Sequence, residues 1–312
     1  MNPNIAGIIS LVIFSTGTLL MLLAKSIPPF ALSSVMLALG FVSISCVQYM
    51  RERSLQQFIT QWKQPLKYYI LVVSGVVGYN VFMITAFNVT ENESEAFAVN
   101  MINYLWPIMI YGFSAYFLGR KIELLHIMGF ALGLVGLFLV MAAGYINATG
   151  LALERGAFSW NWAYISALLA AFLWAFYSAQ SKAHSYPSGF VGPVMCIGSV
   201  VMCAFHFIFE PKISAIEYPV IIAAILLGLS RCSYYLWDYA IRKGDAILLS
   251  SLSNLVPLVS SLLFIVFGFR PASYFTAIGG ALIMAGCLIT NWKVIKTELL
   301  RLKTRRGCSD IN

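Results

Sequence analysis

The sequence is poor in charged residues and contains few cysteines and histidines. Only 10% of its 312 residues are Asp, Glu, Lys or Arg, whereas 60% are hydrophobic, and the mean hydropathy is +0.82. Soluble domains usually contain about 25% charged residues, so this composition excludes an ordinary water-soluble fold. Lipid must solvate part of the chain, and at that depth the backbone groups need partners within the protein. We therefore expect an all-α membrane protein.

The six cysteines and three histidines do not form a metal-binding or redox pattern. No two cysteines have Cys-x-x-Cys spacing, and five of the six lie in or beside apolar runs. Such cysteines are interpreted as small core residues. An intramembrane enzyme would need a nucleophile with its base, a metal cluster or paired acids, and the sequence contains no such set. We therefore predict no catalytic residues, no metal, no cofactor and no enzyme activity.

Long apolar runs define the expected membrane spans. A run of about 20 residues is long enough to cross roughly 30 Å of hydrocarbon as a helix. Ten such runs predict ten transmembrane helices, near residues 5–25, 30–50, 67–88, 95–118, 123–145, 160–182, 189–209, 218–241, 245–269 and 272–292.

The basic residues predict an orientation for these helices. The chain has 20 Lys and Arg residues against 12 Asp and Glu, but they lie mostly in loops and in the C-terminal tail, so nucleic acid is not an expected partner. If the N-terminus is cytoplasmic, fifteen of them fall on the inner side and four on the outer side. The positive-inside rule then predicts a multi-pass protein of the bacterial inner (plasma) membrane with both termini in the cytoplasm.

The two halves of the chain repeat at a constant offset of 150 residues. Residues 103–107 align with 253–257 at this offset, and Gly129 and Gly136 align with Gly279 and Gly286. Because each half contains an odd number of spans, the second copy should run through the membrane in the opposite direction. We therefore predict two inverted five-helix repeats, residues 1–150 and 151–295, followed by a basic cytoplasmic tail, 296–312.

Several motifs resemble a known family. Residues 99–107 read Val-Asn-Met-Ile-Asn-Tyr-Leu-Trp-Pro, and similar family-like motifs occur at 14–16, 172–175, 235–238 and 256–261. Together they resemble the drug/metabolite transporter superfamily in its EamA-like branch, and the Asn-Tyr-Leu-Trp-Pro run is similar to bacterial aromatic amino-acid exporters. This resemblance implies that helices one, three, four, six, eight and nine surround a central cavity, with helices five and ten at the side. The chain departs from the family pattern at Phe14 and Arg231.

Arg231 is expected near the middle of the eighth span. A cation at that depth costs at least about 2.5 kcal/mol on insertion scales, so it needs an interior partner or a water-filled cavity. Its guanidinium is a candidate ligand for a substrate carboxylate. The alternative is an ion pair with Asp238, seven residues later. Asp238 is itself a candidate for binding a coupling proton.

Polar and aromatic side chains on the cavity-forming helices complete the predicted site. The polar stripes on the fourth and ninth spans either line a cavity or form interhelical hydrogen bonds, and the rings either stack against the solute or belong to the core. Pro107 and Pro257 are predicted gate hinges, because proline removes a helical hydrogen bond. The predicted substrate-binding residues are Tyr79, Asn80, Asn100, Asn103, Tyr104, Trp174, Tyr177, Arg231, Tyr234, Trp237, Asp238, Ser250, Ser253 and Asn254.

These features predict an alternating-access transporter that exports small organic solutes. Aromatic or other apolar amino acids are the first substrate hypothesis, and a cationic drug or another small metabolite is the alternative. The expected partners are a small-molecule substrate and the lipid bilayer, with protons as a candidate coupling ion. A monomer and a weak homodimer both remain open.

Overall fold

The structure is a computed structural model of the whole chain. It describes residues 1–90, 95, 99–100, 102–117, 119, 123–149, 162–182, 184, 186–213, 216–269, 273–293 and 296. All secondary structure in these residues is helical, in agreement with the predicted all-α class. The predicted basic tail, 296–312, lies outside the described residues except for Lys296.

The first half of the chain forms helices that begin at clear sequence signals. Asn2 caps the first helix by accepting a hydrogen bond from the Asn4 backbone N–H, and Pro29 occupies the first position of the second helix. Both signals are typical of helix N-termini. The elements are α1 (Pro3–Leu23), α2 (Pro29–Glu52), α3 (Leu55–Trp62), α4 (Leu66–Val73), the π-helical turn η1 (Ser74–Gly78), α5 (Tyr79–Asn88), α7 (Trp106–Phe117) and α8 (Leu124–Thr149).

The second half of the chain is also helical. Asp245 and Ser273 cap helices by accepting hydrogen bonds from backbone N–H groups of the first turn. The elements are α9 (Trp162–Ser181), the short 3-10 helix η2 (Ser188–Phe190), α10 (Val191–Phe209), α11 (Tyr218–Leu229), α12 (Cys232–Lys243), α13 (Ala246–Ser253), α14 (Leu255–Val266) and α15 (Tyr274–Thr290).

Eight helical stretches in the described residues are long and apolar enough to cross a membrane. They coincide with eight of the ten predicted spans. The tenth prediction corresponds to α15, an apolar helix of 17 residues. The fourth corresponds to α7 and the described residues just before it. The helical prediction is therefore confirmed, while the count of ten spans stays a prediction.

In the described residues, three of the predicted spans contain non-helical turn residues near their middle. The fourth is broken at Tyr104 and Leu105, and the ninth is broken at Asn254, in each case two or three residues before a proline. Pro107 and Pro257 have no N–H to donate to the carbonyl four residues earlier, which explains both breaks. The eighth is broken at Ser230 and Arg231, where the Ser233 N–H bonds the Ser230 carbonyl at 3.0 Å.

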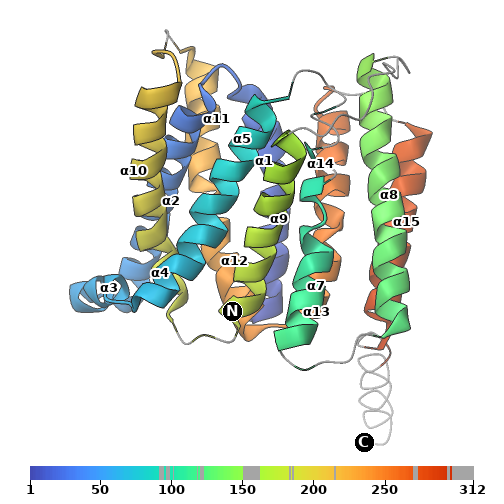
Figure 1. Cartoon of the computed structure of the whole chain (residues 1–312), viewed down its shortest axis with the longest axis horizontal. Helices are drawn as coiled ribbons and strands as arrows, with labels where there is room; N and C mark the ends of the chain where they lie inside the picture. The colour runs from blue at the N-terminus through green and yellow to red at the C-terminus, as the bar shows by residue number, and fades with distance from the viewer. Residues whose placement is uncertain are drawn as a thin grey trace, which may run out of the picture.

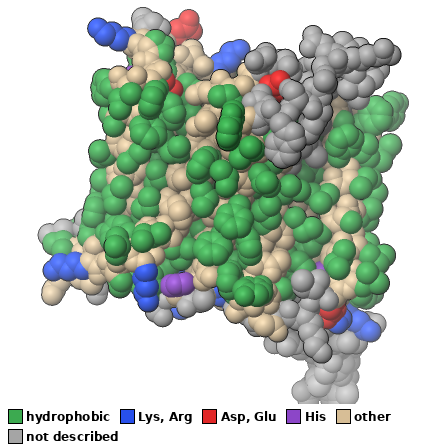
Figure 2. All heavy atoms as spheres, in the orientation of Figure 1, with side chains coloured by type: hydrophobic (Ala, Val, Ile, Leu, Met, Phe, Trp, Pro, Cys, Tyr) green, Lys and Arg blue, Asp and Glu red, His purple; other side chains and the backbone are tan. Residues whose placement is uncertain are grey.

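The helices form one bundle with distinct ends (Figure 1). The pair α8 and α15 lies at one end and the pair α2 and α10 at the other, with α9 and α12 between them. The N-terminus lies on the same face as the C-terminal end of α15. Hydrophobic side chains cover most of the visible side, while Lys and Arg side chains lie near its upper and lower edges (Figure 2). This distribution fits a protein surrounded by lipid.

Glycines bring α8 and α15 into backbone contact. A Cβ atom on Gly136 would lie 2.5 Å from the Gly279 carbonyl oxygen, and a Cβ on Gly279 would lie 2.5 Å from that of Gly136. Gly129 and Gly286 face each other in the same way, at 2.7 and 2.5 Å. Glycine permits this approach because it has no side chain, as in other membrane helix pairs.

Candidate functional site

A cluster of aromatic rings occupies the interior of the bundle. Trp174 of α9 is at its centre, and its ring centroid lies 5.2 Å from Tyr234, 5.4 Å from Tyr79 and 6.3 Å from Trp237. Phe14 of α1 joins the cluster at 5.6 Å from Tyr234. The cluster comprises Phe14, Tyr79, Trp106, Trp174, Tyr177, Tyr234 and Trp237, all packed in one hydrophobic core. We call this set the aromatic cluster.

The local sequence explains how these rings approach one another. The turn η1 places Gly75 directly against Tyr177, and a Cβ atom at this glycine would collide with the tyrosine ring. Tyr79 is the first residue after the π-helical turn. Such turns interrupt the regular helix and often mark functional sites. The turn therefore positions the rings of Tyr79 and Tyr177 from two neighbouring helices.

Arg231 borders the aromatic cluster at the break between α11 and α12. Its guanidinium donates a hydrogen bond of 3.1 Å to the Tyr234 hydroxyl and contacts the sulfur of Met36 at 3.7 Å. The guanidinium carbon lies 5.4 Å from the Tyr234 ring centroid, a cation–π distance. The Nε atom is buried and has no hydrogen-bond partner among the described residues. Arg231 thus retains a free donor beside the rings.

Asn103 borders the same cluster from the fourth span. Its amide nitrogen lies 3.5 Å from the Tyr79 hydroxyl. Its Oδ1 atom is buried and lacks a hydrogen-bond partner within the described part of the chain. Tyr79 is also close enough to Tyr234 and Arg231 to interact with them electrostatically. A free acceptor and a free donor therefore lie beside the rings, on different spans.

The predicted alternative of an Arg231–Asp238 ion pair is wrong. Asp238 instead pairs with Arg242, one turn later on α12, at 3.5 Å. The Asp238 side chain is fully buried and also accepts hydrogen bonds from the hydroxyls of Tyr177 at 2.8 Å and Tyr186 at 3.0 Å. Arg231 immediately precedes α12 and lies about 10 Å along the helix axis from Asp238, whereas Arg242 lies only one turn after it.

The remaining predicted residues are less directly connected to the rings. Ser250, Ser253 and Asn80 donate hydrogen bonds to carbonyls of their own helices. Tyr104 packs with the core residues of α8 and α15, and the Asn254 amide lies against Gly133 of α8. Asn100 is partly buried, and its carbonyl accepts the Tyr104 N–H at 3.1 Å. Their role in substrate binding stays a prediction.

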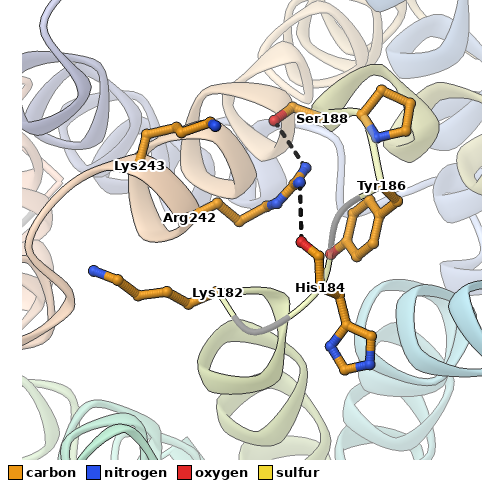
Figure 3. Close-up of a pocket in the computed structure, with 7 residues that line it drawn as sticks. Lys182, His184, Tyr186, Ser188, Arg242 and Lys243 are labelled. Carbon is orange, nitrogen blue, oxygen red and sulfur yellow. Dashed lines mark hydrogen bonds between the residues drawn. The ribbon is translucent and has the colours of Figure 1, made fainter. Parts of the chain in front are cut away.

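Sequence reasoning missed a second polar region at the lower face of Figure 1. A cavity of about 520 Å³ is lined by residues from the loop after α9 and from the end of α12: Lys182, His184, Tyr186, Pro187, Ser188, Arg242 and Lys243. We call it the basic cavity (Figure 3). The signal available in the sequence was Lys182 at the end of the sixth span together with Arg242 and Lys243 at the end of the eighth.

Within the described residues, no group of three or more His, Cys, Asp or Glu side chains could hold a metal ion. The five cysteines in this part of the chain are free thiols.

Comparison with known proteins assigns the family. The model of the EamA-like transporter family matches residues 1–142 and 161–292. The chain belongs to the EamA-like transporter family. This membership confirms the resemblance noted in the sequence and indicates a membrane transporter rather than an enzyme.

Several relatives of this EamA-like protein are named as exporters. It is 27% identical to the aromatic amino acid exporter YddG of Ancylobacter novellus over 93% of this chain and 97% of the relative. It is 26% identical to the aromatic amino acid exporter YddG of Escherichia coli over 98% and 99% of the two chains. A solved crystal structure with 24% identity has the same fold, with a TM-score of 0.81 over 93% of this chain and 97% of that one.

Proposed function

We propose that this protein is an alternating-access exporter of aromatic amino acids. The main support is the pair of unsatisfied polar atoms beside the aromatic cluster, Arg231 Nε and Asn103 Oδ1. A free amino acid is a zwitterion with a side chain. Its carboxylate suits the guanidinium, its ammonium suits an amide oxygen, and its ring suits contacts with Trp174 and Tyr234. The names of the relatives also favour this substrate class.

The relation between the two halves supports alternating access. In the 150-residue alignment Gly129 corresponds to Gly279 and Gly136 to Gly286. The contacts, however, join Gly129 to Gly286 and Gly136 to Gly279. Such exchange of partners is what a two-fold axis between repeats produces. It supports two inverted repeats, in which exchange of conformations between the halves opens the site to opposite sides.

Two further observations agree with the repeat. The family model matches in two stretches that end and begin around residue 150, the proposed boundary. The helix breaks before Pro107 and Pro257 also correspond under the same offset. We propose that these prolines are the hinges of the two gates. The helical hydrogen bonds at each break are already absent, so the helix can bend there without breaking any.

The half-buried Arg231 favours an amino acid over the alternative of a cationic drug. A cation at the aromatic cluster would be repelled by Arg231, whose guanidinium bonds the hydroxyl of a ring in that cluster. A like-charge contact in a medium of low dielectric is strongly unfavourable.

We also propose that the protein lies in the bacterial inner membrane with both termini in the cytoplasm, as the exporter relatives and the distribution of basic residues favour.

Flux from proteoliposomes tests this proposal. Vesicles are loaded in turn with phenylalanine, tyrosine, tryptophan, leucine and phenethylamine, which lacks the carboxylate. We expect the three aromatic amino acids to leave fastest. Arg231→Gln removes a hydrogen bond from a charged donor, worth about 1.5 kcal/mol or more, so flux at low substrate concentration should fall about tenfold.

The matched control is Lys212→Gln, which removes one positive charge from an exposed position. It should transport normally. Absence of aromatic amino-acid flux from the unmodified protein would refute the proposed substrate, and faster flux of phenethylamine would favour the cationic alternative. Repeating the assay with an imposed pH gradient reveals whether protons are coupled to the flux.

A further inference from the structure

The basic cavity has the size and the chemistry of a site for a small anion. Its volume of about 520 Å³ lies within the range of small-molecule pockets, roughly 300–1,000 Å³. Three cationic side chains line it, Lys182, Arg242 and Lys243, and none of its described lining residues is acidic. Figure 3 shows the Arg242 guanidinium in the middle, with the two lysines on one side and His184 and Tyr186 on the other.

Arg242 is held in place by its neighbours but keeps an unused hydrogen-bond donor. Its guanidinium donates to the Ser188 hydroxyl at 3.3 Å and to the His184 carbonyl at 3.2 Å, and it stacks on the Tyr186 ring at 4.3 Å. Its Nε atom is buried without a hydrogen-bond partner in the described residues. Its contact with Asp238 is long, at 3.5 Å. Charge-assisted bonds between arginine and a carboxylate are usually about 2.7–2.9 Å and often paired.

A single layer of side chains separates the basic cavity from the aromatic cluster. Asp238 lies in this layer, one turn before Arg242 on α12, and accepts hydrogen bonds from the hydroxyls of Tyr177 and Tyr186. Tyr177 is also a member of the aromatic cluster, with its ring 5.7 Å from Trp174. The carboxylate that restrains Arg242 is thus connected directly to the rings of the proposed substrate site.

Asp238 can lose Arg242 without becoming an isolated buried charge. Its two tyrosine donors would remain, and burial together with the Asp238 charge raises the pKa of Tyr186, so this phenol stays protonated and can donate. Losing one of three partners costs far less than leaving a carboxylate bare. A second carboxylate can therefore take the place of Asp238 on Arg242.

We propose that the basic cavity is an entry site for the carboxylate of the amino-acid substrate, in which Arg242 exchanges Asp238 for that carboxylate. This inference rests on the proposed function. Lys182 and Lys243 attract the anion, and Arg242 orients it. The release of Asp238 loosens the layer formed with Tyr177 and Tyr186, which opens the way to the aromatic cluster. On the predicted topology the cavity faces the cytoplasm, where an exporter loads its substrate.

The first test compares the two faces of the membrane. Initial uptake of phenylalanine is measured in inside-out and right-side-out vesicles carrying the unmodified protein, Lys243→Gln or Lys63→Gln. Both lysines are exposed on the same face, but only Lys243 lines the cavity. We expect Lys243→Gln to raise the KM about tenfold in inside-out vesicles, with an unchanged maximal rate, and to leave right-side-out uptake unaltered. Lys63→Gln should behave like the unmodified protein in both.

The second test measures binding without transport. The Arg231→Gln protein is placed in lipid nanodiscs, and its affinity for 3-phenylpropionate is measured by calorimetry with and without Lys243→Gln. Because Arg231→Gln weakens the central site, the remaining affinity reports on the basic cavity. We expect about tenfold weaker binding with Lys243→Gln and no change with Lys63→Gln, in neutral lipid alone and in lipid containing phosphatidylglycerol.

The outcomes separate the two proposals. If aromatic amino acids are not transported but 3-phenylpropionate binding depends on Lys243, the proposed function fails and the cavity remains a carboxylate site. If transport occurs but Lys243→Gln changes neither the KM nor the binding affinity, the entry site is refuted and the proposed function stands. Equal changes in KM on both faces of the membrane would also overturn the entry site. An effect of Lys243→Gln on binding that appears only in lipid containing phosphatidylglycerol would overturn it in favour of a lipid phosphate.

Discussion

The contact between α8 and α15 yields a quantitative prediction for Gly136→Ala. The new methyl group would lie 2.5 Å from the Gly279 carbonyl oxygen and 2.8 Å from the Ile283 nitrogen. Both neighbours are backbone atoms that cannot rotate away, so the two helices must separate. Overpacking of this kind costs about 1–3 kcal/mol, and the rest of the α8–α15 interface would lose contacts as the helices move.

The matched control is Gly112→Ala on α7, where a Cβ atom would meet nothing within 4 Å. Alanine at a helical position without a clash should leave stability unchanged or raise it by up to about 1 kcal/mol. Unfolding free energies of both variants can be compared by titration of the purified protein from mild detergent into SDS, followed by circular dichroism. Lower stability is expected for Gly136→Ala only.

A double variant makes the test stricter. Gly279→Ala places its methyl group 2.5 Å from the Gly136 carbonyl oxygen. Because either substitution alone forces the helices apart, the second should then cost much less than it does alone. Equal stability of Gly136→Ala and the unmodified protein would refute the described packing. Full additivity of the two substitutions would show that they act independently.

Three further predictions concern the layer next to the basic cavity, a proposed gate hinge and the cap of α2. Asp238→Asn removes the charge that faces half-buried Arg242 and should lower the free energy of unfolding by about 1–3 kcal/mol, measured in the same SDS titration. Pro107→Ala restores a backbone donor at the helix break, so turnover in proteoliposomes should fall several-fold while the melting temperature is kept or raised. Glu210 accepts hydrogen bonds from two backbone N–H groups at the start of α2, at 2.6 and 3.1 Å. Glu210→Gln should therefore lower the unfolding free energy by about 1–2 kcal/mol, and an unchanged value would argue against this cap.

The sequence predicted the helices well because membrane spans have a strong signal. Long apolar runs mark where backbone N–H and C=O groups must form hydrogen bonds within the chain. Pro107 and Pro257 marked two of the three breaks. The break at Ser230 was not predicted, because neither residue there removes a backbone donor. The short helix α3 was also missed, since its eight residues are too few to span a membrane.

The sequence predicted several residues that the structure brings together in the interior, but not how they pair. The sequence identified Arg231, Asp238 and most of the rings, because charged and polar residues in apolar runs are conspicuous. It could not show that Asp238 pairs with Arg242, since Arg242 was assigned to a loop while the helix actually continues to Lys243. The basic cavity depends on folding of the loop after α9 against the end of α12, a long-range contact without a local signal.

The glycine-lined contact of α8 with α15 also bears on how motion in this protein can be observed. Two helices that touch through backbone atoms have no side-chain rotamers with which to adjust their separation, so any sliding would break the contact outright. Unlike the interrupted spans, α8 is described as continuous over 26 residues. Spin labels on these two helices should therefore keep a constant separation throughout the transport cycle, which would make the pair a fixed internal reference for distances measured to every other helix.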